Sequence, residues 1–264
     1  MSMKKLVIVG CGHLAEIVAD AIIGGILPEY ELVGVYSRTV EKAVYLANKM
    51  QRYGKTCLAC RSLEELLSLK PDYLVESASP AAMKELALPT LENGTSIVTL
   101  SIGALADTAF YQQVIETAKK NATRVYIASG ATGGFDVLRT ATLMGNASAR
   151  FFNEKGTNRL RRSVVYDPIL ETEKRIVFSG TAREAIAIFP TGLNVSVAAS
   201  LASVGPEEMQ VAMQATPGFI GDTQRVEIKN DQVHAVVNVY SATPEIAGWS
   251  VVSTLQNIVS PIVF

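Results

Sequence analysis

Residues 4–15 read KKLVIVGCGHLA, in which a short apolar run ends in the pattern Gly-x-Gly-x-x-Ala. Residues 6–9 are typical of a buried strand, and apolar residues at helical spacing follow the pattern. Gly10 permits a tight turn, Gly12 lets the backbone approach a pyrophosphate, and Ala15 lets helix and strand pack closely. This order of strand, turn and helix predicts a dinucleotide site; the alternative is a tight turn that binds no nucleotide.

The predicted helix begins at about His13 and continues to residue 23. The amides of a helix's first turn point along its axis, and the positive end of the helix dipole favours phosphate groups there. We therefore expect His13 and Leu14 to contact the cofactor together with Gly10, Gly12 and Ala15.

The 264-residue chain is 48% apolar and 19% charged, which suits a large folded core in one or two domains. Its formal net charge of −1 gives no reason to expect nucleic acid as a partner. Its apolar runs stay short of the ~18 residues that a membrane span needs. The chain also enters its first predicted strand without a signal-peptide pattern. We expect a cytoplasmic protein that binds neither membranes nor nucleic acid.

Cys57 and Cys60 form a C-x-x-C pattern, and Cys11 is the third cysteine of the chain. A redox pair of this kind sits at the start of a helix, where the thiolate is stabilised. Here the pair lies on a predicted short strand, on which positions three apart face opposite ways. A second C-x-x-C, which would complete a zinc site, is not in the sequence. We expect neither a redox centre nor a metal site.

Strands and helices alternate along the first half of the chain. The predicted strands are 6–9, 31–36, 57–60, 73–77, 96–100 and 124–128, and helices are predicted between them. Repeated βα units of this length predict an α/β fold of the Rossmann type, a doubly wound parallel sheet with helices on both faces. We expect a dinucleotide-binding domain over residues 1–128.

The pattern changes after residue 128. Strands are predicted at 160–166, 175–178, 209–215, 225–228 and 233–240, and helices at 135–143, 182–188 and 194–202. This order predicts a second, α+β domain over residues 129–247, with a mostly antiparallel sheet. We expect the last segment, residues 248–264, to pack back onto the first domain.

The end of the second strand decides between NAD and NADP in Rossmann domains. An acid at that place binds the ribose 2′-hydroxyl of NAD. Here Ser37 and Arg38 occupy it. A hydroxyl and a guanidinium suit the 2′-phosphate of NADP, so the sequence favours NADP over NAD. The alternative is a surface arginine at the end of a strand.

Several later segments resemble the L-aspartate dehydrogenase family, which is related to the homoserine dehydrogenases. They are residues 75–80 (VESASP), 100–107 (LSIGALAD), 129–136 (SGATGGFD) and 178–185 (FSGTAREA), followed by Phe189-Pro190 and Asn194. Their order and spacing match the family over most of the chain, to about residue 223.

The resemblance implies a two-domain enzyme, usually a homodimer, that oxidises a small amino acid to its imine with NAD(P)⁺. The imine of aspartate then enters nicotinamide-cofactor biosynthesis or is hydrolysed to oxaloacetate and ammonia. The resemblance further implies that the cofactor contacts Ser77, Ala78, Ser101, Ala131 and Asn194, and that the substrate carries a carboxylate.

The sequence departs from the family at its proton-transfer residue. The family has a His in an N-x-H segment, and counting forward from Asn194 places that position at Gln224. Glutamine forms hydrogen bonds but does not exchange a proton near neutral pH. If Asn230-Asp231 forms a two-residue hairpin turn, Gln224 pairs with Val237, and His234 pairs with Glu227 on the other face of the sheet. His234 is then unable to replace the missing base.

Two further departures concern the substrate side. Glu245 stands where the family's N-P-K-T-S-type segment has Lys, and the segment before Asn194 reads TGL, residues 191–193, in place of K-N-x. Glu76 and Asp136 are candidate substitute acids or bases, although Glu76 equally suits a structural role. Lys155 and Arg183 are candidate cations for a substrate carboxylate, or surface ion-pair partners.

Two functions therefore remain open at this point. The first is an NAD(P)-dependent oxidoreductase for aspartate or a related small acid, with Gln224 as an orienting group. The second is a catalytically silent NADP(H)-binding relative that senses the cofactor or binds a partner.

Overall fold

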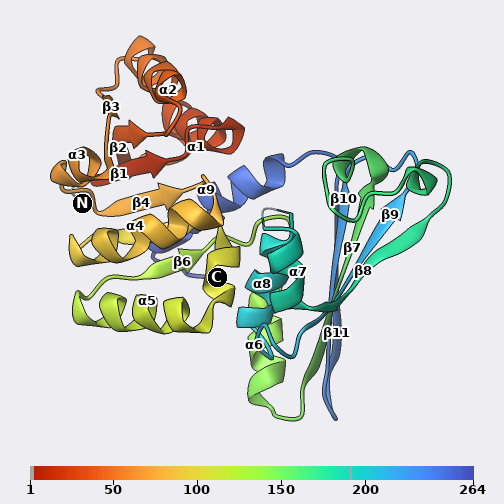
Figure 1. Ribbon diagram of the computed structural model, residues 1–264. Helices are drawn as coiled ribbons and strands as arrows, with labels where there is room; N and C mark the ends of the chain where they lie inside the picture. The colour runs from red at the N-terminus through yellow and green to blue at the C-terminus, as the bar shows by residue number, and fades with distance from the viewer. Residues whose placement is uncertain (1–2, 191) are drawn as a thin grey trace. The chain divides into compact units, whose positions relative to one another are not determined.

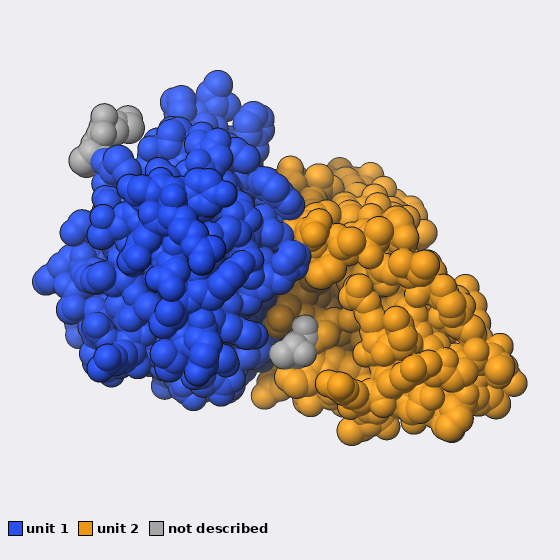
Figure 2. Space-filling model, turned by 90° about the horizontal axis from the view of Figure 1, so that it is seen from above, with its two compact units in different colours: residues 1–128, 247–264 blue, residues 129–246 orange. Residues whose placement is uncertain are grey.

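The computed structural model describes residues 3–190 and 192–264. These residues fall into two compact units, residues 1–128 with 247–264 and residues 129–246 (Figure 2). Within the described residues, every helix is too short or too polar to cross a lipid bilayer.

The first unit is built on a six-stranded parallel sheet in the order β3-β2-β1-β4-β5-β6 (Figure 1). Its elements are β1 (Lys4–Val9), α1 (His13–Ile23), β2 (Tyr30–Tyr36), α2 (Val40–Arg52), β3 (Leu58–Cys60), α3 (Leu63–Ser68), β4 (Tyr73–Glu76), α4 (Pro80–Glu92), β5 (Ser96–Thr99), η1 (Ile102–Ala106), α5 (Thr108–Lys120) and β6 (Val125–Ile127). This strand order confirms the predicted Rossmann sheet. Strands β2 and β3 are added on one side of β1, and β4, β5 and β6 on the other, so the order of addition reverses between β1 and β4.

The core of this unit follows from its apolar strands. Leu6 and Ile8 of β1 are fully buried, as expected for a central strand covered on both faces. The last helix, α9 (Glu245–Val259), joins this core: Val251 and Leu255 are buried in it, and the Tyr30 hydroxyl donates to the Leu255 carbonyl over 2.7 Å.

The second unit contains a mixed, mostly antiparallel sheet in the order β11-β10-β7-β9-β8, which confirms the predicted α+β domain. Its elements are α6 (Phe135–Leu143), β7 (Ser148–Gly156), η2 (Thr157–Arg159), η3 (Pro168–Glu171), β8 (Arg175–Thr181), α7 (Ala182–Ile188), α8 (Asn194–Leu201), β9 (Gln210–Thr216), β10 (Asp222–Lys229) and β11 (His234–Ser241). The helices α6, α7 and α8 lie on one face of this sheet (Figure 1).

The strand predicted at residues 160–166 is wrong. That segment forms successive turns, in which the amides of Leu160 and Ser163 donate to carbonyls three residues earlier. The sheet uses β7 instead. Two of the inward positions of β7 carry Asn153 and Lys155, and these buried polar residues conceal the alternation that identifies a strand.

The predicted hairpin register is also wrong, by two residues. The turn centres on residues 231–232, and Gln224 pairs with Val239 rather than Val237. The Asn230 side chain explains the shift, because its Oδ1 accepts the amides of Gln232 and Val233 and its Nδ2 donates to the Ala141 carbonyl. A shift of two keeps every side chain on its face.

Candidate cofactor and substrate sites

The turn after β1 requires glycine at its first position. Gly10 has φ +93°, in the left-handed region, and a Cβ there would lie 2.7 Å from the amide nitrogen of Ala78. The Ser77 hydroxyl donates to the Gly10 carbonyl over 2.8 Å. The turns after β1 and β4 therefore touch at the point where the strand order reverses.

Gly12 faces open space. It is the N-cap of α1, makes no side-chain cap, and a Cβ there would meet no atom within 4 Å. The first turn of α1 follows with His13 exposed, Leu14 half-buried and Ala15 buried. A helix start with open space before it and no capping side chain suits a phosphate group, so these residues fit the pyrophosphate of a dinucleotide.

A cavity of about 340 Å³ lies beside this turn. Its lining includes Gly10, Gly12, Ser37, Arg38, Ser77 and Ala78, so six of the predicted cofactor residues converge on one cavity. Lys42, in the first turn of α2, lines it as well, as does Glu85 of α4. Sequence reasoning missed Lys42, although its position four residues after Arg38, on the helix that follows β2, was an available signal.

Glu76 is fully buried at the end of β4 and connects two loops. Its carboxylate accepts hydrogen bonds from the amides of Ala78 and Ser79. It also accepts bonds from the Thr99 hydroxyl and from both the amide and the hydroxyl of Ser101. Burial raises the pKa of Glu76, and these bonds oppose the shift. With five donors bound, Glu76 is a structural carboxylate that fixes the turns after β4 and β5, Ser101 included.

In the second unit, the glycine-rich loop at residues 129–134 lies against α8 and β11. Gly130 and Gly134 both have positive φ, and added Cβ atoms would contact the side chains of Val195 and Val237, at 3.3 and 2.5 Å. Val237 pairs with Val226, two residues from Gln224 on the same face of β10. The loop that carries Ala131, the start of α8 at Asn194 and this face of the sheet are therefore neighbours.

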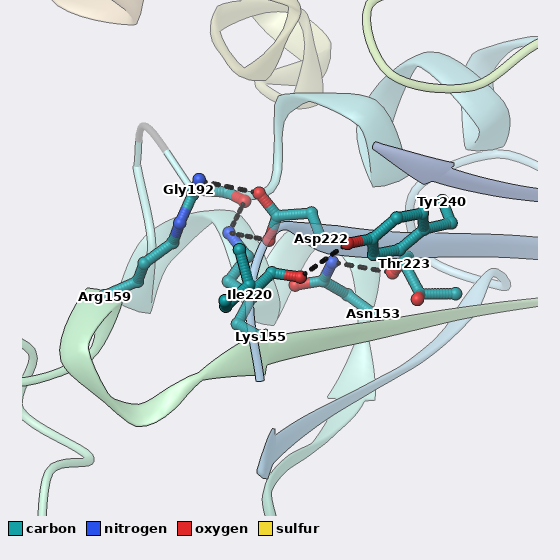
Figure 3. Close-up of polar contacts among 8 residues, drawn as sticks. All are labelled: Asn153, Lys155, Arg159, Gly192, Ile220, Asp222, Thr223 and Tyr240. Carbon is teal, nitrogen blue, oxygen red and sulfur yellow. Dashed lines mark hydrogen bonds and ion pairs between the residues drawn. The ribbon is translucent and has the colours of Figure 1, made fainter. Parts of the chain in front are cut away.

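Gln224 lies on the buried face of β10, opposite Asn153 of β7. The Asn153 Nδ2 donates to the Thr223 carbonyl over 3.0 Å. Figure 3 draws this bond as a dashed line. The side-chain oxygens of Asn153 and Gln224, by contrast, have no donor: within the described residues, Asn153 Oδ1 and Gln224 Oε1 are enclosed and accept no hydrogen bond.

The next pair along these strands is Lys155 and Asp222 (Figure 3). The Lys155 Nζ donates to the Gly192 carbonyl over 2.8 Å and lies 3.9 Å from Asp222 Oδ1, while Arg159 donates to Asp222 Oδ2 over 2.7 Å. Burial lowers the pKa of Lys155, and Asp222 opposes that shift. Lys155 is thus a buried cation beside the Gln224 position rather than a surface ion-pair partner.

The remaining candidates lie on exposed surfaces. His234 binds Glu227 over 2.9 Å on the face of β10 opposite Gln224, which agrees with the prediction that it does not replace the missing base. Arg183 forms an exposed ion pair with Glu207, and Asp136 is exposed in the first turn of α6. Of the TGL segment, Thr191 lies outside the described residues.

The three cysteines are free and buried. Burial raises the pKa of Cys11 and Cys57 to about 12 and that of Cys60 to about 11, the opposite of what a redox thiolate needs. Among residues 3–190 and 192–264, no cluster of His, Cys, Asp and Glu could hold a metal ion.

Comparison with protein families gives one match for each half of the chain. The family described as "Homoserine dehydrogenase, NAD binding domain" matches residues 10–128, and the family described as "Aspartate dehydrogenase, C-terminal" matches residues 136–258.

Relatives match over most of their length. The L-aspartate dehydrogenase of Methanosarcina mazei is 32% identical over 273 aligned positions, and the alignment covers 98% of both chains. That of Methanococcus maripaludis is 32% identical over 231 residues, or 86% of this chain and 84% of the relative. The crystal structure of aspartate dehydrogenase from Thermotoga maritima superposes with a TM-score of 0.76, at 25% identity and 99% coverage of both chains.

Proposed function

The chain belongs to the L-aspartate dehydrogenase family, and from that premise we propose that this NAD(P)-dependent oxidoreductase dehydrogenates L-aspartate, or a close relative of it, with NADP⁺. The observation that supports it most is the cavity at the Gly10 turn, where predicted cofactor residues from three βα units converge. The relatives named for this activity match nearly the whole chain.

The reaction removes a hydride from the carbon that carries the amino group and a proton from the nitrogen, which leaves a C=N bond. When bound, the nicotinamide would supply the acceptor for this hydride. The residues of this chain would have the other tasks: the Gly12 turn and the start of α1 would hold the pyrophosphate, and Ala131 and Asn194 would contact the cofactor near its nicotinamide. The protein must also hold the amino group in place while its carbon reacts.

The preference for NADP rests on the charges of the cavity. Arg38 and Lys42 both line it, next to the Ser37 hydroxyl, and its acidic lining residue, Glu85, comes from α4 rather than from the end of β2. Two cations and a hydroxyl favour a 2′-phosphate over a 2′-hydroxyl.

Gln224 takes the position of the family's His in this proposal. Its amide orients the substrate's amino group and does not take up a proton. The proton then leaves to another acceptor or to water, so we expect turnover to rise with pH as more of the free amine is present.

A spectrophotometric assay tests the function. L-aspartate, a panel of other amino acids and the corresponding oxo acids are supplied with NADP⁺ or NAD⁺ and the reduced forms. We expect aspartate to reduce NADP⁺ with a higher kcat/KM than NAD⁺. A protein that binds NADPH in calorimetry but turns over no member of the panel would instead be the silent relative.

Arg38→Ala and Lys42→Ala test the cofactor preference. Each removes one charge-assisted contact, so NADP⁺ affinity should fall about tenfold or more while NAD⁺ affinity stays within about twofold. Equal losses for both cofactors would remove these residues from the 2′-phosphate site.

The proposed assembly is a homodimer formed through the open face of the second sheet. Val236 and Tyr240 of β11 are 42% and 57% exposed on that face, beside a cavity of about 290 Å³ lined by Phe152, Arg225 and Glu227. Sedimentation should show a dimer for the wild type and a monomer for Val236→Lys; a monomeric wild type rejects this assembly.

A further inference from the structure

The buried face of the second sheet carries three acceptor oxygens that no described residue satisfies. They are Asn153 Oδ1, Asp222 Oδ1 and Gln224 Oε1, each enclosed and without a hydrogen-bond donor among the described residues. The other oxygen of Asp222 accepts from Arg159, so Asp222 is half satisfied.

These oxygens belong to one patch of the sheet. Asn153 and Gln224 are directly opposite each other on β7 and β10, and Asp222 is two residues before Gln224, on the same face. Directly opposed residues have Cβ atoms about 5 Å apart, and diagonal neighbours are about 7–8 Å apart. The side chains of Asn, Asp and Gln are long enough to bring their oxygens to one bound group across these separations.

The orientation of Asn153 is set by its surroundings. Its Nδ2 donates to the Thr223 carbonyl, which turns Oδ1 away from that contact (Figure 3). Asp222 has no donor to offer when it is ionised. The patch therefore presents acceptors.

Buried acceptors without donors destabilise a fold, and folds that retain them commonly do so at functional sites. A partner for this patch must bring N–H or O–H groups to these three oxygens. A primary ammonium offers three donors and a neutral amine two. A carboxylate offers none when ionised.

We propose that Asn153, Asp222 and Gln224 form the subsite that binds the amino nitrogen of the substrate. The inference rests on the proposed function, which requires an amine as substrate, and assigns that amine to three named oxygens. Because the oxygens are enclosed, this binding requires a movement of the protein. The Gln224 side chain provides it by rotating about its three single bonds toward the amine.

The charges around this subsite allow it. Lys155, on β7, donates its Nζ hydrogen to the Gly192 carbonyl and forms an ion pair over 3.9 Å with the Asp222 oxygen that accepts no hydrogen bond. Arg159 takes the other Asp222 oxygen. Burial lowers the pKa of Lys155, which is the direction that eases the approach of an amine. Lys155 also has hydrogens left for a substrate carboxylate.

Two ligands that differ in the amino group alone test the subsite. L-aspartate and succinate are titrated into the protein with NADPH present, which prevents turnover of aspartate. Gln224→Met and Asn153→Leu each remove one acceptor at similar size. We expect each variant to weaken aspartate about tenfold or more and succinate less than about twofold.

Gln214→Met is the matched control. Gln214 lies on β9 opposite Glu154, on the other face of the same sheet, and bonds to that carboxylate. The same exchange there should leave both ligands unchanged. If the assay identifies another amino acid as the substrate, that amino acid and its analogue without the amino group replace the pair.

The outcomes separate the two proposals. A wild type that oxidises aspartate, with variants that weaken aspartate and succinate equally, overturns the subsite and leaves the function intact. Unchanged binding of both ligands in both variants overturns it as well. A wild type that turns over no amino acid overturns the function, and the subsite with it. Because Asn153→Leu also removes the bond to Thr223, a variant that fails to fold leaves Gln224→Met to decide.

Discussion

Glu76 and Gln224 are both buried polar residues, but their surroundings differ. The Glu76 carboxylate accepts five hydrogen bonds from its own unit. Gln224 and its neighbours Asn153 and Asp222 leave three oxygens without a described donor. In the first unit, the donors of the protein itself therefore satisfy the buried Glu76 carboxylate. In the second unit, the three unsatisfied oxygens are the acceptors that we assign to the substrate amine.

The largest expected effect comes from breaking the satisfied side. Glu76→Ala removes the acceptor of five buried donors and opens a cavity, so the free energy of unfolding should fall by about 4 kcal/mol. Gln224→Met removes an oxygen that has no donor, so it should leave the fold as stable or raise its stability by about 1 kcal/mol. Denaturant unfolding of the two variants without ligand measures both.

The reverse order of these two effects would contradict the comparison. A loss of several kcal/mol from Gln224→Met would mean that its amide is satisfied in the free protein. Glu76→Gln serves as a control, because it keeps the size and one acceptor oxygen. Its free energy of unfolding should lie between that of the wild type and that of Glu76→Ala.

A second prediction separates the two glycines of the cofactor turn. Gly10→Ala forces a Cβ to within 2.7 Å of the Ala78 backbone at positive φ, and should lower the free energy of unfolding by about 3 kcal/mol. Gly12→Ala meets open space at a normal φ, and should change stability by less than about 1 kcal/mol. Thermal unfolding without cofactor measures both.

Cofactor binding should reverse the contrast in part. The space in front of Gly12 is where we place the pyrophosphate, so Gly12→Ala should weaken NADPH binding at least about tenfold in calorimetry although the fold is intact. Unchanged affinity in Gly12→Ala would move the phosphates away from this turn.

The same contrast explains what the sequence could predict. The β1 turn and α1 depend on neighbouring residues, since a glycine at Gly10 and an apolar helix after His13 are local signals. The parallel sheet with helices on both faces follows from the alternation of strands and helices, whereas the order of its strands is a finding of the structure. The role of Glu76 depends on Thr99 and Ser101 of the next βα unit. Local sequence patterns do not contain these contacts, so the sequence allowed both a catalytic base and a structural carboxylate.

The second unit was harder to predict for a related reason. Strand β7 was missed because Asn153 and Lys155 interrupt its apolar alternation. Asn153 is part of the candidate subsite, and Lys155 pairs with Asp222 of that subsite. The hairpin register depended on the Asn230 side chain, which bonds to α6. Residues placed for ligand binding or for distant contacts break the local patterns that sequence reasoning uses.

The smallest expected effect concerns Lys155 and pH. Burial holds its pKa below the value of about 10.4 that it has in the unfolded chain. Between the two pKa values, the unfolded chain binds the proton and the folded chain does not, so stability rises with pH across this window. The buried cysteines act in the opposite sense above about pH 9, since their folded pKa values are raised.

The measurement is the difference in unfolding free energy between wild type and Lys155→Met, in which the contribution of the cysteines cancels because both proteins contain them. We expect this difference to shift in favour of the wild type as pH rises toward 10. A difference that does not change with pH would mean that Asp222 and Gly192 keep Lys155 fully charged, and that the amine subsite has a full positive charge beside it.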